Sequence, residues 1–151
     1  MVKIDVSIPG REELHLELTV NDQGQIQKSQ VKAVGGWDFL KLVQEFRQNL
    51  KGAVKDLVAP HGASVGALLI REAILKAQGN WTPPYCEEEL CHCRGIPTEK
   101  VDLAILSGAH TPRQVSAQTS ASTACGTCRP NVEAMISYRL GGALRLANSG
   151  N

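Results

Sequence analysis

The first 85 residues of this chain contain no cysteine, and aromatic side chains are scarce throughout, at 4% of the 151 residues. All five cysteines fall between residues 86 and 128. The first half therefore cannot supply thiol ligands or a thiol nucleophile. Any cysteine-based metal chemistry belongs to the second half, where a small aromatic-poor core would gain most from a bound metal.

The chain also has no excess of either charge and no long apolar run. Its 16 lysines and arginines balance 15 acidic residues, for a formal net charge of +1. A nucleic-acid-binding surface normally appears as a clustered basic surplus. The longest apolar stretches, such as Ala67-Leu68-Leu69-Ile70, are far too short to cross a bilayer. We therefore expect neither a nucleic-acid partner nor a membrane partner.

The residues at the start of the sequence do not form the apolar segment of a secretory signal, so we expect a cytoplasmic protein. Thiols stay reduced in that compartment, which favours metal ligation over disulfides. Five cysteines also fit a four-ligand site with one spare thiol better than a disulfide framework. No nucleophile–base arrangement, phosphate-binding glycine loop or acid pair is apparent, and we expect no enzyme activity.

The first half has the pattern of a small sheet followed by helices. Residues 2–8 and 14–20 alternate apolar and polar side chains, and residues 25–34 form a third candidate strand, with Ile26, Val31 and Val34 as its apolar positions. Helical spacing then follows at Phe39, Leu40, Val43, Phe46 and Leu50, and again from Ser64, a possible N-cap, to Gly79. This order predicts an α+β fold, a three-stranded antiparallel sheet with helices on one face. Trp37 is interpreted as a packing residue.

Pro83 and Pro84 interrupt the periodicity and suggest a domain boundary. We predict an α+β domain over residues 1–80, a linker over 81–85 and a small all-helical domain over 86–147. Helices are expected from about Pro97 to Ser107, from Thr111 as N-cap with Gln114 completing a capping box, and from near Cys128, with a polar loop over residues 116–124.

Four of the cysteines form two closely spaced pairs. The first pair is Cys91 and Cys93, in Cys91-His92-Cys93, and the second is Cys125 and Cys128, in Cys125-Gly126-Thr127-Cys128. A helix–turn–helix between the pairs would bring all four sulfurs together, and a second pair that leads into a helix places its thiolates near amide N–H donors. Such a four-thiolate site suits either zinc or an iron–sulfur cluster.

The cysteine spacing and the flanking residues resemble the bacterioferritin-associated-ferredoxin-type [2Fe-2S] domain, which also occurs in NifU proteins. The resemblance covers about residues 90–140 and is carried by the two cysteine pairs together with Ile96, Ala104-Ile105, Gly108-Ala109, Thr111 and Val115. It implies a [2Fe-2S] cluster with Cys91, Cys93, Cys125 and Cys128 as ligands. It also implies single-electron transfer or iron–sulfur cluster biogenesis, with a redox or assembly protein as partner. The family usually has glycines where this chain has Ser122 and Ala124.

The first half is similar, on fewer residues, to the N-terminal scaffold domain of the IscU and NifU proteins. The positions of that family's ligand cysteines hold Gly35-Gly36 and Gly62 here. The resemblance therefore implies a scaffold fold without cluster chemistry, which could retain a docking surface. Alternatively, the whole chain is an adaptor for protein interactions, whose fold is stabilised by zinc or by a cluster and which undergoes no redox turnover.

The residues near the cysteine pairs have competing interpretations. Cys86 is read as a spare thiol rather than a ligand, and His92 is expected to turn outward from the site. Arg94 and Arg129 follow the two pairs and would either offset cluster charge or remain solvated. The acidic run at residues 87–89 is either a solvated face or a docking strip for a basic redox partner.

Overall fold

The computed structural model describes residues 1–124 and 126–141, which divide into two compact units. The first unit spans Met1–Trp81, and the second begins at Thr82. Each unit has its own set of buried apolar side chains, so each is described separately below. Cys125 lies outside the described residues, as do residues 142–147 of the predicted second domain.

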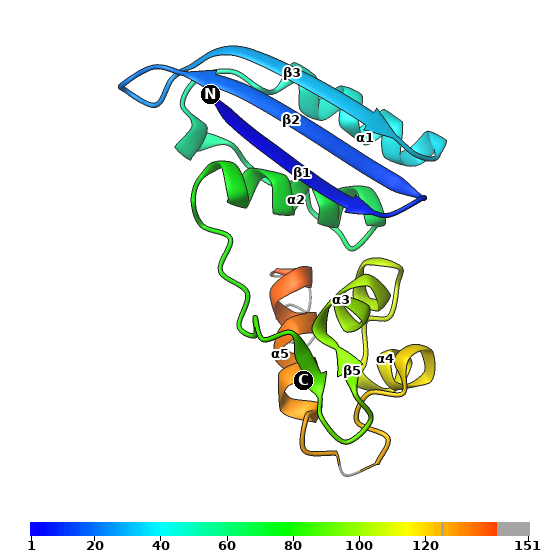
Figure 1. Cartoon of the computed structure of the whole chain (residues 1–151). Helices are drawn as coiled ribbons and strands as arrows, with labels where there is room; N and C mark the ends of the chain where they lie inside the picture. Colours follow the sequence, from blue (N-terminus) through cyan, green and yellow to red (C-terminus); the bar gives the residue numbers. More distant parts are fainter. Residues whose placement is uncertain (125, 142–151) are drawn as a thin grey trace, which may run out of the picture. The chain divides into compact units, whose positions relative to one another are not determined.

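A three-stranded antiparallel sheet forms the first half of the first unit (Figure 1). Its strands are β1 (Val2–Ile8), β2 (Glu12–Val20) and β3 (Ile26–Val34), in the order β1-β2-β3. Ile4 pairs with Leu16, and Leu16 pairs in turn with Val31, so these buried side chains share one face. The opposite face carries polar side chains, as the period-2 alternation predicted.

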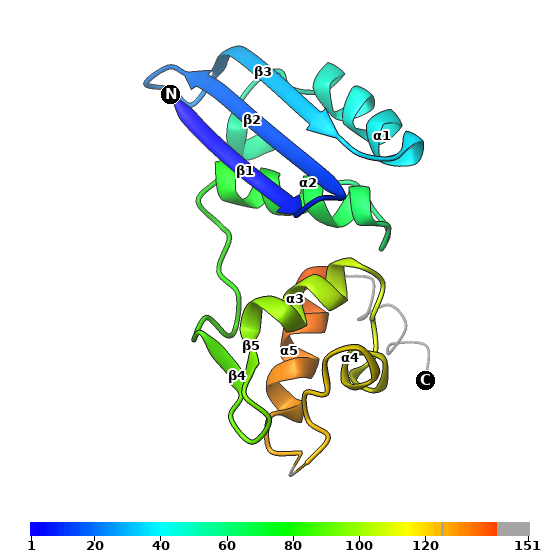
Figure 2. The ribbon, with the colours of Figure 1, turned by 45° about the vertical axis from the view of Figure 1, so that its right-hand side comes forward.

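Helices α1 (Trp37–Gln48) and α2 (Val65–Ala77) cover the apolar face of this sheet (Figures 1 and 2). A short 3₁₀ helix, η1 (Val54–Asp56), lies between them in the chain. Ser64 caps α2 by accepting a hydrogen bond from the amide of Ala67 at 3.2 Å, as predicted. The predicted α+β architecture, with its sheet first and helices after, is therefore confirmed.

Three apolar residues of this unit are not where their spacing placed them. Val34 is 61% exposed because it lies on the opposite face of β3 from Val31. Trp37, at the first position of α1, is 80% exposed and is not a packing residue. Leu40 is partly exposed, since Phe39, Val43 and Phe46 form the buried stripe of α1. The helical spacing of α1 was predicted correctly, but its buried face is narrower than predicted.

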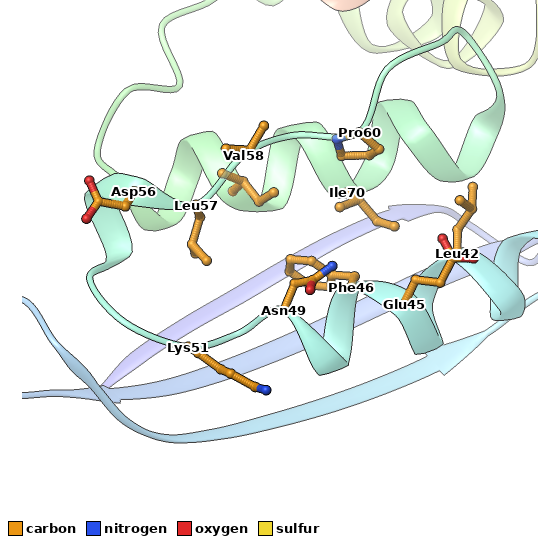
Figure 3. A pocket seen from close by; sticks show the side chains of 11 residues that line it. Leu42, Glu45, Phe46, Asn49, Lys51, Asp56, Leu57, Val58, Pro60 and Ile70 are labelled. Atoms are coloured by element: carbon orange, nitrogen blue, oxygen red, sulfur yellow. The ribbon is translucent and has the colours of Figure 1, made fainter.

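A pocket of about 330 Å³ lies within the first unit, between α1, α2 and the segment after η1 (Figure 3). Leu42 and Phe46 line it from α1, Ile70 lines it from α2, and Leu57 and Val58 close it. None of its lining residues is a predicted ligand. No helix in the described part of the chain is both long and apolar enough to cross a membrane.

The second unit consists of a short hairpin and three helices (Figure 2). The hairpin pairs β4 (Glu89–Cys91) with β5 (Ile96–Pro97), and the helices are α3 (Thr98–Leu106), α4 (Pro112–Thr119) and α5 (Arg129–Leu140). Helix α3 matches its predicted bounds within one residue at each end, and α4 and α5 begin within one residue of their predicted starts. Helix α4 continues to Thr119, although residues 116–124 were predicted to form a loop. The hairpin is an addition to the predicted helical layout, and it carries the first cysteine pair.

The N-cap of α4 agrees with the predicted capping box except for one hydrogen bond. Thr111 accepts a hydrogen bond from the amide of Gln114 at 3.2 Å, and Pro112 occupies the first helical position. In a capping box, the Gln114 side chain would return to the amide of Thr111. Here it accepts instead from the amide of His110, one residue earlier, at 2.9 Å.

Candidate metal centre

Cys91 is the last residue of β4 and is almost completely buried, with 1% of its surface exposed. Its neighbour Leu90 is equally buried, so the short strand anchors the first cysteine pair in the core of the unit. The chain then turns at residues 92–95 and returns as β5, where Ile96 pairs with Cys91. The hairpin therefore places the first sulfur in the core of the unit, while the turn that follows lies at the surface.

Cys128 occupies the N-cap of α5 and is 6% exposed. Gly126 has a positive φ of 72°, a conformation that glycine adopts without steric cost. The turn is closed by the amide of Arg129, which donates to the carbonyl of Gly126 at 3.2 Å. Because the N-terminus of a helix carries partial positive charge, this position favours a negatively charged sulfur.

The structure brings one cysteine of each pair into direct contact, since the side chains of Cys91 and Cys128 form a hydrogen bond. Burial alone would raise the pKa of Cys91. Backbone amides of Ser122, Arg94 and Cys93, together with the Cys128 thiol, outweigh that effect and lower the pKa of Cys91. Cys91 is therefore the sulfur that more readily carries the negative charge.

The pKa of Cys128 is shifted in the other direction. Burial raises it first, and the neighbouring Cys91 raises it further because a thiolate there would repel a second negative charge. Hydrogen bonding from Ser122 partly offsets both effects. The two buried sulfurs cannot both carry a negative charge without a free-energy cost. A cation bound between them would neutralise that charge.

An ion pair connects two helices of the second unit. Arg139 on α5 binds Asp102 on α3 in a bidentate arrangement, with Nε–Oδ1 and Nη2–Oδ2 distances of 2.8 and 2.7 Å. The Arg139 side chain is only 6% exposed. Since α3 follows directly from β5, this pair links α5 to the base of the hairpin that holds Cys91.

The other predicted ligands are not part of this contact in the described residues. Cys93 is exposed in the turn after β4 and contributes its amide to Cys91. Cys125 lies outside the described residues. Over residues 1–124 and 126–141, no group of three or more histidine, cysteine or acidic side chains is placed to hold a metal ion. The described site is therefore the Cys91–Cys128 pair and its amide donors.

The remaining candidates lie at the surface. Cys86 is exposed with a free thiol and precedes β4, which agrees with its interpretation as a spare residue. His92 is exposed, and its Nδ1 lies 3.2 Å from a carboxylate oxygen of Glu89. Arg129 forms an exposed ion pair with Glu133 at 3.2 Å, which favours the solvated interpretation of that arginine.

Comparison with known proteins bears on this part of the chain. Residues 90–137 match the family model of the BFD-like [2Fe-2S] binding domain. The matched stretch contains both cysteine pairs and ends within α5. No curated protein and no solved structure matches the chain. The similarity of residues 1–80 to a scaffold domain and the relation to NifU proteins therefore stay predictions.

The chemistry of the described residues fits such a cluster. Cysteine thiolates are the ligands of [2Fe-2S] centres, and hydrogen bonds to sulfur stabilise their charge. The Cys91–Cys128 contact supplies sulfur from both pairs, and three backbone amides point at the first sulfur. The sequence had marked Ser122 only as a departure from the family pattern, yet Ser122 contacts both cysteines. The sequence offers one signal for this contact: Ser122 stands just ahead of the second pair, where the family pattern usually has glycine.

Proposed function

We propose that this chain holds a [2Fe-2S] cluster with Cys91, Cys93, Cys125 and Cys128 and exchanges single electrons with a redox protein partner. The proposal rests on the contact between Cys91 and Cys128, one from each pair, and on the backbone amides that donate hydrogen bonds to Cys91. When bound, the cluster supplies a one-electron redox couple. The protein would supply the ligands, the hydrogen bonds to sulfur and the exclusion of water from the buried thiols.

Several features favour electron transfer with a retained cluster over cluster delivery. Cys91 and Cys128 are buried, and the Arg139–Asp102 ion pair joins α5 to α3, the helix that follows the hairpin. Releasing a cluster would require these elements to separate. The thiols of Cys86, Cys91 and Cys128 are free, which suits a reducing compartment, so we propose that the protein works in the cytoplasm.

A redox titration of the anaerobically purified protein tests this function. We expect visible charge-transfer bands that bleach on reduction and return on oxidation, with a one-electron slope. Bands that move to an added cluster-free acceptor protein, without reversible cycling, would indicate a role in cluster biogenesis instead. A colourless protein containing zinc would indicate a structural adaptor, because four thiolates also suit tetrahedral zinc.

A further inference from the structure

The loop between α4 and the second cysteine pair is held by hydroxyl groups of α4. Thr119, which is buried, donates to the carbonyl of Val115 at 2.8 Å and accepts from the amide of Ala121 at 3.1 Å. Ser116 donates to the carbonyl of Ala121 at 2.7 Å. Ala121 itself is fully buried. The backbone that leads into Ser122 is therefore well determined, although the segment contains no regular secondary structure.

Ser122 adopts a backbone conformation that L-amino acids seldom use. Its φ is +63°, in the left-handed region where the Cβ atom crowds the following carbonyl. Non-glycine residues persist in that region only where the surrounding structure determines them. The fixed loop on one side and the two cysteines on the other supply that constraint at Ser122.

This conformation turns both polar groups of Ser122 toward the sulfurs. Its backbone N–H hydrogen-bonds to Cys91 and to Cys128, and its hydroxyl lies close enough to hydrogen-bond to Cys128. The hydroxyl oxygen is buried, and no described group forms a hydrogen bond of standard geometry with it. A buried hydroxyl without a well-formed partner costs free energy unless a group at the site accepts a hydrogen bond from it.

We propose that the Ser122 hydroxyl donates a hydrogen bond to the sulfur of Cys128 when that sulfur is a cluster ligand, and that it raises the reduction potential of the cluster. Ser122 is thus a positioning and tuning residue rather than a ligand. The inference rests on the proposed [2Fe-2S] function. Reduction adds one electron from the redox partner and moves no proton from Ser122. The donor stabilises the more negative reduced state more than the oxidised state, so the potential rises.

The test compares midpoint potentials of the full-length, cluster-loaded protein and three variants by spectroelectrochemical titration. Ser122→Ala removes the hydroxyl and keeps the Cβ atom, whereas Ser122→Gly removes the hydroxyl and also suits the positive φ. Ser120→Ala is the matched control, because Ser120 lies in the same loop with a φ of +67° and is exposed.

We expect both Ser122 variants to lower the potential by a similar amount, roughly tenfold in the redox equilibrium constant, which is about 59 mV for one electron. Ser120→Ala should leave the potential unchanged. The vibrational frequencies of the iron–cysteine bonds should shift in both Ser122 variants and not in the control. A purely structural role for Ser122 would change cluster content or stability without these paired shifts.

Several outcomes would overturn the inference. Unchanged potentials in Ser122→Ala and Ser122→Gly would show that the hydroxyl does not act on the cluster. Loss of the cluster from Ser122→Gly, whose backbone suits the loop, would assign the hydroxyl to cluster retention instead. A red-brown wild-type protein distinguishes both of these from failure of the proposed function, in which the wild type itself contains no cluster.

Discussion

Cys91, at the end of β4, and Cys128, at the N-cap of α5, are hydrogen-bonded to each other through their side chains. The two residues come from different cysteine pairs, separated in the chain by α3 and α4. Their contact shows that the helical segment between the pairs doubles back, as a four-sulfur site requires. It also explains the opposite pKa shifts of the two thiols, because only one of two adjacent buried sulfurs can readily carry charge.

Replacing Cys125 with serine should abolish the visible bands, because a serine hydroxyl is a poor substitute for a thiolate ligand of iron. Absorption spectra of protein purified without oxygen measure this directly. Cys86→Ser provides the matched control, since Cys86 is exposed and precedes β4. Full bands in Cys125→Ser, or loss of the bands in Cys86→Ser, would show that the four ligands were chosen incorrectly.

Removing the Asp102 carboxylate should destabilise the second unit. Asp102→Ala removes the carboxylate that pairs with the nearly buried Arg139 guanidinium. We expect the free energy of unfolding to fall by roughly 3 kcal/mol, the lower end for a broken buried pair, because Asp102 is partly exposed. Urea denaturation followed by circular dichroism gives this value.

The exposed ion pair between Arg129 and Glu133 supplies the comparison for that experiment. Glu133→Ala also removes a carboxylate that pairs with an arginine of α5, but both partners are more than half exposed. Its effect should stay within about 0.5 kcal/mol. Equal effects of the two substitutions would contradict a bracing role for the Arg139–Asp102 pair.

Glycine substitutions in and after α4 should have opposite effects on stability. Ser120, the C-cap of α4, has a φ of +67°, so Ser120→Gly should relieve strain and stabilise the unit by roughly 1 kcal/mol. Ala117 lies within the helix and is exposed, so Ala117→Gly should destabilise it by about 1 kcal/mol. Thermal unfolding curves would show midpoints shifted in opposite directions. A destabilising Ser120→Gly would contradict the assigned backbone conformation.

Removing the metal should loosen only the second unit. Binding to the folded state alone stabilises that state, and the proposed ligands all lie beyond Thr82. Hydrogen–deuterium exchange before and after acid removal of the metal should therefore accelerate in β4, β5 and the start of α5. Exchange in β1, β2 and β3 should not change. Equal acceleration across both units would indicate that the site does not reside where we place it.

Much of the fold followed from the sequence because its signals are local. The alternation of Leu14, Leu16 and Leu18 predicted a buried sheet face, and Ser64 and Thr111 predicted the starts of two helices. The exposure of Val34 and Trp37 did not follow, because it depends on which face the neighbouring elements cover. Strand parity alone would have separated Val34 from Val31.

The sequence predicted that the two cysteine pairs converge, because their spacing is typical of chelation whatever the fold. The structure shows one such contact, between Cys91 and Cys128, and the ligand set stays a prediction. The role of Ser122 could not be predicted, because it depends on a positive φ that nothing in the residue type requires. The β4–β5 hairpin was also missed, since two strands of three and two residues leave almost no periodicity to detect.

The proposed site requires the two cysteine pairs to converge on one diiron cluster. Iron, acid-labile sulfide and zinc can be quantified in the wild-type protein after purification without oxygen, together with its visible spectrum. We expect about two irons and about two sulfides per chain, with negligible zinc and red-brown charge-transfer bands. A colourless protein with one zinc ion and no labile sulfide would contradict the account.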